Sequence, residues 1–218
     1  MARKTIAIIG ATGKMGSALA RSLSRGAYRL LLFSGQKEKA EALAGEIRKE
    51  NPAADIECRL CPADASWEAD IIIPAVPYAA EKELAQKISA FATRKIVVSI
   101  SNPLNGDYSG LLTPSGNSAG EAMQQLLPDA RVVKAFNTTY AADFGQPSIN
   151  GQKVDSFIAG DDKESVETVM EMVRTAGFNP VVAGALSVSR TLEAMQLLLI
   201  QLTVRNGYNW LAGWKILH

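Results

Sequence analysis

The sequence predicts an α/β fold in which helices cover both faces of a parallel β-sheet. Short apolar segments alternate with amphipathic helical patterns along the chain, which is typical of repeated strand–helix units. Residues 71–73, Ile-Ile-Ile, are apolar at successive positions, so both faces of that strand are expected to be buried. The 218 residues, 47% hydrophobic and 21% charged, suffice for a sizeable core without disulfides or metals.

The same alternation gives the elements in chain order. Met15, Leu19 and Leu23 recur every four residues and give the first helix one apolar face. Strands are expected at 5–9, 28–33, 55–59, 69–76, 95–100, 131–136, 154–159 and 180–183. Helices are expected at 14–25, 37–49, 80–91, 118–127, 163–176 and 187–206, with polar loops at 105–117 and 143–153.

Composition excludes several classes of function. The 23 basic and 22 acidic residues leave a net charge of +1, which offers no field to attract nucleic acid or an anionic membrane. The single histidine, His218, makes a histidine-centred catalytic triad or metal site improbable.

Residues 197–200 are the longest apolar stretch and too short to cross a bilayer, and no signal-peptide core follows the N-terminus. With two cysteines only, Cys58 and Cys61, we expect a cytoplasmic protein.

A glycine-rich turn stands where the first strand becomes the first helix. Gly10, Gly13 and Gly16 provide the sharp bend, the close approach of the main chain to a pyrophosphate, and close helix–strand packing. The helix N-terminus would then present unpaired N–H groups to the phosphates. A purely structural turn is the alternative. The pattern predicts a doubly wound, Rossmann-like dinucleotide-binding core over residues 1–145, followed over 146–218 by extra strand–helix units and a short helical C-terminal part.

The end of the second strand favours NADP(H) over NAD(H). An NAD site usually places a carboxylate there to bind the ribose 2′-hydroxyl. This chain has Ser34 instead, followed by Lys37 and Lys39, which can donate a hydrogen bond and supply positive charge to a 2′-phosphate. Alternatively, the two lysines belong only to the solvated face of a surface helix.

Three further strand ends carry small or hydroxyl residues. They are Ala75–Tyr78, Ser99–Leu104 and Val133–Thr139. Because ligands of an open parallel sheet bind beyond the carboxyl ends of its strands, we expect the nicotinamide ribose and ring at these segments, which include Ser101, Asn102 and Pro103.

Taken together, these motifs resemble the NADP oxidoreductases that depend on the deazaflavin coenzyme F420, and also the oxidoreductase domains of the STEAP metalloreductases. The resemblance covers nearly the whole chain. It is most specific at residues 10–16 (Gly-Ala-Thr-Gly-Lys-Met-Gly), 101–104 (Ser-Asn-Pro-Leu) and 133–138 (Val-Lys-Ala-Phe-Asn-Thr), and 160–162, 189–193 and 213–217 add to it.

The resemblance implies an NADP(H)-dependent oxidoreductase that transfers hydride between NADPH and a deazaflavin, a flavin or a related acceptor. Its implied cofactor contacts are Thr12, Gly13, Lys14 and Met15 at the pyrophosphate, Ser34 and Lys39 at the 2′-phosphate, Val76 and Pro77 at the adenosine or ribose, and Asn137 and Thr138 near the nicotinamide. Ring-to-ring hydride transfer needs no general acid or base, so we expect neither a catalytic side chain nor a metal.

The acceptor would lie between the loop at 105–117 and the C-terminal segment, where Tyr208, Trp210 and Trp214 could stack on a planar ring. Core packing or a dimer interface is the alternative role for these aromatic residues. We also expect a homodimer through an apolar face of the last helix, formed by Leu192, Met195, Leu199 and Leu202.

Other patterns suggest weaker alternatives. Tyr78 and Lys82 match the Tyr-x-x-x-Lys pair of short-chain dehydrogenases but stand too early in the chain for it. Cys58 and Cys61 have redox spacing, yet would point to opposite faces of a strand. Asp161 or Asp162 is expected to cap a helix, and Arg190 is expected to pair with Glu193. A binding protein that senses NADP(H) without turnover is the rival function.

Overall fold

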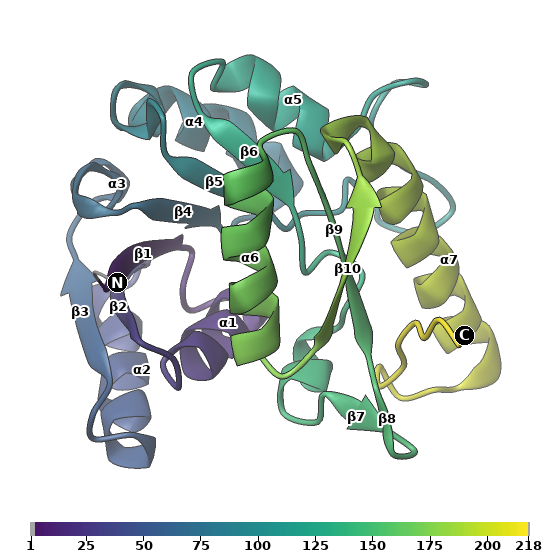
Figure 1. Cartoon of the computed structure of the whole chain (residues 1–218), viewed down its shortest axis with the longest axis horizontal. Helices are drawn as coiled ribbons and strands as arrows, with labels where there is room; N and C mark the ends of the chain where they lie inside the picture. The colour runs from purple at the N-terminus through teal and green to yellow at the C-terminus, as the bar shows by residue number, and fades with distance from the viewer. Residues whose placement is uncertain (1–2, 218) are drawn as a thin grey trace.

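An eight-stranded sheet organises the chain in this computed structural model, which describes residues 3–217 (Figure 1). Its strand order is β10-β9-β6-β5-β4-β1-β2-β3. The strands are β1 (Lys4–Ile9), β2 (Tyr28–Phe33), β3 (Asp55–Arg59), β4 (Ile71–Pro74), β5 (Ile96–Ser99), β6 (Arg131–Lys134), β9 (Asp155–Gly160) and β10 (Asn179–Gly184). The expected α/β, Rossmann-like fold is confirmed. The sheet includes strands from both sides of residue 145, and His218 lies outside the described residues.

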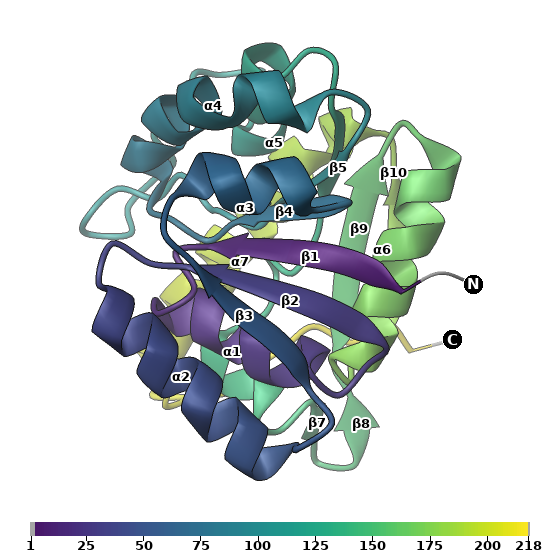
Figure 2. The same cartoon turned by 90° about the vertical axis from the view of Figure 1, so that its left-hand side faces the viewer.

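Helices cover both faces of the sheet (Figure 2). They are α1 (Lys14–Leu23), α2 (Lys37–Glu50), α3 (Pro62–Glu68), α4 (Tyr78–Ala92), α5 (Ala119–Leu126), α6 (Lys163–Thr175) and α7 (Ser189–Asn206). Alternate residues of β1 enter opposite layers: Ile6 and Ile8 pack with α1, α2 and α6, whereas Ala7 and Ile9 pack with α3, α4 and α5. Both layers exclude water, which explains why successive residues in the middle of the inner strands are apolar.

The two last strands of the sheet differ from the expected parallel arrangement. β9 pairs with β6 in the antiparallel direction, and β10 then runs parallel to β9. A parallel return needs a crossover of a dozen or more residues, usually helical. Between β6 and β9 the chain forms only the short 3-10 helix η1 (Ala141–Phe144) and the hairpin of β7 (Ser148–Ile149) and β8 (Gln152–Lys153). The loop expected at 143–153 is therefore partly structured, and α3 is a helix that the sequence pattern did not reveal.

The C-terminal helix α7 packs against its own chain. Leu192 is buried beside β9, and Leu199 is buried beside Tyr140. The apolar face that we expected to form a dimer thus belongs largely to the interior of the protomer, because β9 and the segment after β6 need a cover of their own. Met195 and Leu202 of the same face are only half-buried, and the homodimer stays a prediction.

Helix caps follow the expected chemistry. Ser118 Oγ accepts a hydrogen bond from the Glu121 N–H at 3.1 Å, and Asp162 Oδ1 accepts one from the Ser165 N–H at 2.9 Å. Both caps satisfy N–H groups that the first turn of a helix leaves unpaired. Asp161 instead accepts a hydrogen bond from the Leu186 N–H at 3.0 Å and so anchors the segment before α7.

Candidate functional site

The turn from β1 to α1 has a geometry that only glycine permits at two positions. Gly10 has φ +91°, and a Cβ atom there would lie 2.3 Å from the carbonyl oxygen of Ala75. A Cβ atom at Gly16 would lie 2.3 Å from the carbonyl oxygen of Gly10. The turn therefore lies directly against the end of β4, and α1 packs directly on the turn, as a dinucleotide-binding turn requires.

The start of α1 presents backbone N–H groups toward the carboxyl edge of the sheet. Three amides of the turn donate to carbonyls of the chain itself, those of Gly10, Ala11 and Gly13. Three other amides of the same segment, those of Thr12, Lys14 and Met15, have no acceptor among residues 3–217. Gly13, the N-cap, brings no side-chain cap to replace one. Unpaired amides at the positive end of a helix suit a pyrophosphate.

Ser34, at the end of β2, lies beside this turn. Its Oγ is 2.7 Å from Thr12 Oγ1 and accepts a hydrogen bond from the Gln36 N–H at 3.2 Å. A Cβ atom at Gly35 would meet no atom within 4 Å, so the space next to the serine is open. The structure thus brings together two expected contacts that follow separate strands, with open space beside them and a serine where an NAD site usually has a carboxylate.

The two lysines after Ser34 are on the first turn of α2, and both are exposed. Lys37 Nζ lies 3.6 Å from Glu41 Oε1, which offsets part of its charge. Within the described chain Lys39 has no carboxylate in ion-pair range, so its ammonium is the more available of the two. Beyond the end of β4, Val76 is half-buried and Pro77 is exposed just before α4.

At the ends of β5 and β6, two asparagines join the neighbouring loops. Asn102 Nδ2 donates to the Asn137 carbonyl at 2.8 Å, and Asn137 Nδ2 donates to Asn102 Oδ1 at 2.9 Å. Phe136, just before Asn137, is fully buried with φ +59°, a conformation that such a residue rarely adopts. This strained turn fixes the direction in which Asn137 leaves the strand.

Not every expected residue of this region lines an open surface. Thr138 is fully buried, and its Oγ1 accepts a hydrogen bond from the Phe157 N–H at 3.4 Å. Pro103 is also buried, and its carbonyl accepts a hydrogen bond from Leu112 at 2.6 Å. The polar groups of both residues are hydrogen-bonded within the protein. Thr138 and Pro103 therefore stabilise the loops instead of contacting the cofactor directly.

Comparison with known proteins agrees with a dinucleotide-binding site. Residues 5–103 match the family described as NADP oxidoreductase, coenzyme F420-dependent. An F420-dependent NADP reductase of Methanocaldococcus jannaschii is 31% identical over 208 residues, which cover 92% of each chain. The chain belongs to this family. It is an NADP-dependent oxidoreductase, as the motifs implied.

Two further proteins are similar to part or all of the chain. The metalloreductase STEAP3 of Rattus norvegicus is 36% identical over 108 residues, which span 49% of this chain and 21% of that protein. The crystal structure of a candidate F420-dependent NADP reductase from Arthrobacter sp. FB24 superposes with a TM-score of 0.83. It is 23% identical, covers 98% of this chain and 99% of its own, and confirms the fold.

Under the ends of β5 and β6 the oxidoreductase has a buried ionic cluster that the sequence analysis missed. Lys134 and Glu193 are both fully buried, with Lys134 Nζ 2.6 Å from Glu193 Oε1. Burial lowers the pKa of Lys134, and the Glu193 carboxylate opposes that shift. Burial also raises the pKa of Glu81 to about 7, against the influence of Ser101 and Lys134. The signal in the sequence was Lys134, a charged residue at the end of a strand expected to be buried.

This cluster corrects the expected pairing on α7. Glu193 pairs with Lys134, whereas Arg190 pairs with Glu121, its Nε 2.9 Å from Glu121 Oε2. Positions three apart on a helix can pair, but here Arg190 binds Glu121 near the surface, whereas the buried Glu193 binds Lys134 and the first amides of α5.

Aromatic residues from three segments of the chain meet in one cluster. Trp210 contacts Tyr140 with ring centroids 5.6 Å apart and Tyr108 with centroids 6.2 Å apart, both edge-to-face. Tyr108 and Trp210 have positive φ angles of 57° and 58°. The loop at 105–117 and the C-terminal segment therefore meet as expected. Trp214 is half-buried and packs in the interior, and Tyr208 is exposed.

The weaker alternatives gain no support from the structure. The pKa of Tyr78 is raised, first by burial and then by Glu81 and Glu193, whereas a short-chain dehydrogenase needs a tyrosine of lowered pKa. Cys61 caps α3, its Sγ accepting a hydrogen bond from the Asp64 N–H at 3.3 Å, and Cys58 belongs to β3. Among the described residues, no group of three His, Cys, Asp or Glu side chains could hold a metal.

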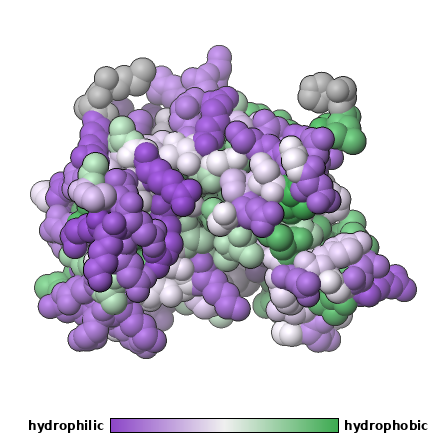
Figure 3. Space-filling model, turned by 90° about the horizontal axis from the view of Figure 1, so that it is seen from below, coloured by the Kyte–Doolittle hydropathy of each residue, from purple (hydrophilic) through white to green (hydrophobic). Residues whose placement is uncertain are grey.

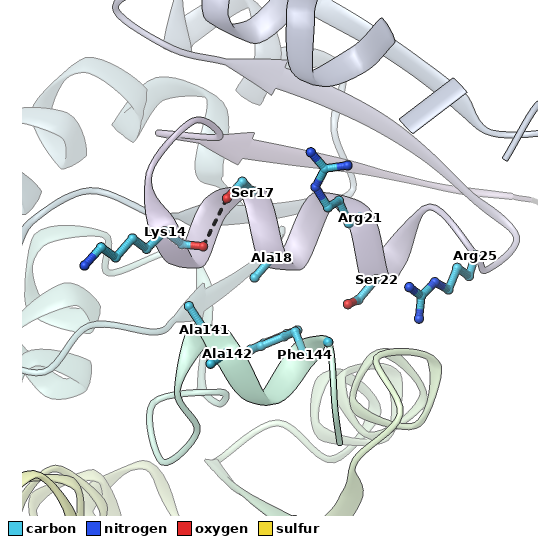
Figure 4. Close-up of a pocket in the computed structure, with 10 residues that line it drawn as sticks. Lys14, Ser17, Ala18, Arg21, Ser22, Arg25, Ala141, Ala142 and Phe144 are labelled. Carbon is cyan, nitrogen blue, oxygen red and sulfur yellow. Dashed lines mark hydrogen bonds between the residues drawn. The ribbon is translucent and has the colours of Figure 1, made fainter. Parts of the chain in front are cut away.

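A groove of about 410 Å³ lies along α1, opposite η1 (Figure 4). Lys14 stands at one end of its wall and Arg25 at the other, and the small residues Ala141 and Ala142 form the opposite side. From below, the surface is hydrophilic over the α2 side, whereas apolar and weakly polar residues gather toward the middle and right (Figure 3). No helix within residues 3–217 is long and apolar enough to span a membrane.

Proposed function

We propose that this oxidoreductase transfers hydride between NADPH and the deazaflavin coenzyme F420. The observation that carries the proposal is the glycine turn with its unpaired amides beside Ser34, in a chain that aligns with an F420-dependent NADP reductase over 92% of both lengths. The residues fit the cofactor: two glycines stand where a Cβ would collide, and open space adjoins Ser34.

The nucleotide end binds through charge and backbone amides. The amides of Thr12, Lys14 and Met15 would hold the pyrophosphate at the positive end of α1. Ser34 and Lys39 would hold the 2′-phosphate, Ser34 as a hydrogen-bond donor and Lys39 as a cation. Val76 and Pro77 would contact the ribose beyond β4.

At the nicotinamide end, Asn102 and Asn137 would form the surface under the ring, which we call the floor. Their side-chain amides are hydrogen-bonded to the other residue of the pair. Asn102 is half-buried and can contact the carboxamide group, whereas Asn137 is only 1% exposed and acts by holding Asn102 in place. Bound NADPH supplies the hydride. The chain supplies binding, alignment and exclusion of water, which are what direct hydride transfer between two rings needs from a protein.

The acceptor would lie against the cluster of Tyr108, Tyr140 and Trp210. Tyr140 is fixed by a 2.9 Å hydrogen bond between its hydroxyl and Thr203 Oγ1, and the Tyr108 carbonyl accepts a hydrogen bond from Gln201 Nε2 at 2.9 Å. Trp210 remains 45% exposed, so part of its ring can still contact a ligand. Aromatic rings offer a planar deazaflavin stacking or edge contacts.

The organisation of the chain follows from this assignment. Residues 1–145 would hold the nucleotide, and residues 146–218 would add the acceptor side. We also propose that the protein acts in the cytoplasm, which its unpaired Cys58 and Cys61 favour. Leu198 and Val204 are exposed on α7, 46% and 62%, and support a homodimer. Sedimentation as a monomer at micromolar concentration would exclude the dimer.

The decisive experiment mixes the protein with NADPH and, in separate reactions, F420, FMN, a quinone and a ferric chelate. We expect loss of the nicotinamide absorption band with F420, and slower loss with NADH in place of NADPH. Tight NADPH binding without oxidation by any acceptor would instead support an NADP(H) sensor.

A further inference from the structure

Four separate segments of the chain meet at one buried ion pair. Lys134 Nζ lies 2.6 Å from Glu193 Oε1 on α7 and 2.6 Å from the Ser101 carbonyl oxygen in the loop after β5, with Ser99 Oγ at 3.5 Å. Glu193 in turn accepts hydrogen bonds from the amides of Ala119 and Gly120, at 3.0 and 3.3 Å, where α5 begins. The pair thus joins β6, α7, the loop after β5 and the start of α5.

Both ends of the nicotinamide floor are one to three residues from this ammonium group. Ser101 precedes Asn102 directly, and Lys134 is three residues before Asn137. The two asparagines are bonded to each other, but their mutual hydrogen bonds fix only their relative position. The bond from Lys134 to the Ser101 carbonyl fixes that floor relative to the sheet.

Stability alone gives little reason for such a pair. Removing two charges completely from water is costly, and well-packed apolar residues of similar volume often stabilise a fold equally well or better. Both side chains are fully buried here. Their hydrogen bonds are directional and converge on one loop, which is what placing that loop requires.

We propose that Lys134 and Glu193 are positioning residues that hold the Asn102–Asn137 floor in register with the nicotinamide ring, an inference that rests on the proposed function. The charged pair acts through the Ser101 carbonyl and touches neither substrate. Loss of the pair lets the loop shift, so the nicotinamide half of the cofactor loses affinity and alignment while the adenosine half keeps its contacts.

The test compares the binding of two ligands, NADPH and 2′,5′-ADP, which lacks the nicotinamide half. The variant Lys134→Met/Glu193→Gln removes both charges of the pair together, so neither partner is left buried without the other, and the glutamine oxygen can still accept from the α5 amides. We expect unchanged affinity for 2′,5′-ADP and about a tenfold loss of affinity for NADPH. Single-turnover hydride transfer to F420 should fall by about 10- to 100-fold.

A matched control removes an ion pair far from the floor. Arg29→Met/Glu68→Gln takes away a pair between β2 and α3 and should leave both affinities as in the wild type. Glu193→Gln alone keeps the lysine and the side-chain volume, and it should shift the ratio of the two affinities in the same direction by less.

An unchanged ratio of NADPH to 2′,5′-ADP affinity in either folded variant would overturn the proposal. Failure of the proposed function is a different result: wild-type protein would then bind NADPH without reducing F420. The ratio of affinities can still be measured in that case, so the two failures are distinguishable.

Discussion

Replacing Ser34 by aspartate should reverse the preference between NADPH and NADH. Ser34 lies at the end of β2, 2.7 Å from Thr12 Oγ1, in the position where dinucleotide folds select the group on the ribose. The new carboxylate could accept hydrogen bonds from Thr12 and from the Gln36 N–H, so the variant is expected to fold. It would face the 2′-phosphate of NADPH and the 2′-hydroxyl of NADH.

The size of the effect follows from the half-buried, partly solvated setting of the serine. A phosphate of charge about −1.5 to −2 at roughly 5 Å from a carboxylate, with an effective dielectric constant of about 40 to 80, is repelled by about 1.5 to 3 kcal/mol. NADPH affinity should therefore fall by about 10- to 100-fold, whereas NADH affinity should be equal or higher.

Dissociation constants from the fluorescence of each bound nucleotide measure this change directly. Ser34→Asn is the matched control, because it has nearly the shape of aspartate without its charge, and it should lose much less NADPH affinity. Equal losses in the two variants would refute the electrostatic reasoning, as would an unchanged NADPH-to-NADH ratio in Ser34→Asp.

Three other substitutions test the site and its surroundings. Gly35→Arg places a guanidinium in open space beside Ser34 and should tighten NADPH binding by about 1 kcal/mol in a salt-dependent way, with NADH titration as the control. Gly10→Ala forces a Cβ to within 2.3 Å of a carbonyl oxygen and should lower the unfolding free energy by about 3 kcal/mol or more in urea melts, whereas Gly45→Ala, on an open helix face, should raise it by about 0.5 kcal/mol. Glu81 has its pKa raised from 4.5 to about 7, so the folded state binds a proton that the unfolded state has lost, and the unfolding free energy should fall by about 3 kcal/mol as pH rises through that window. Glu81→Gln should flatten this slope, and an unchanged slope would show that other groups cause it.

The nucleotide end could be predicted from sequence because its chemistry is local. Gly10, Gly13 and Gly16 are close together in the chain, and at Gly10 and Gly16 a Cβ atom would collide with a carbonyl oxygen. Ser34 follows one strand later, and the parallel register of β1 and β2 pairs Ile9 with Phe33, which brings the serine beside the turn. Strand–helix alternation alone is enough to predict that neighbourhood.

The acceptor side depends on contacts between distant segments, which no local pattern specifies. The reversed direction of β9 accompanies a connection, residues 135–154, that contains only η1 and a hairpin instead of a crossover helix, and its residues resemble an ordinary polar loop. Arg190 and Glu193 satisfy the helical spacing for a pair, yet each binds a residue about 60 to 70 positions away. The interior role of Trp214 depends likewise on packing by β9, because its indole would otherwise be as exposed as that of Trp210.

The nucleotide end and the nicotinamide end of the site are therefore held by different kinds of contact, so they should differ in their tolerance of substitutions. Backbone amides and glycines at the nucleotide end tolerate few substitutions, because a Cβ at Gly10 or Gly16 collides with a carbonyl oxygen. The nicotinamide floor is held by side chains, and an ionic pair can be exchanged for other packing without loss of the fold. Relatives that share the turn but use another hydride acceptor would accordingly be expected to differ at the aromatic positions of Tyr108, Tyr140 and Trp210 rather than at the glycines. A change of acceptor then requires a change in these side chains, while the binding of the phosphates stays the same.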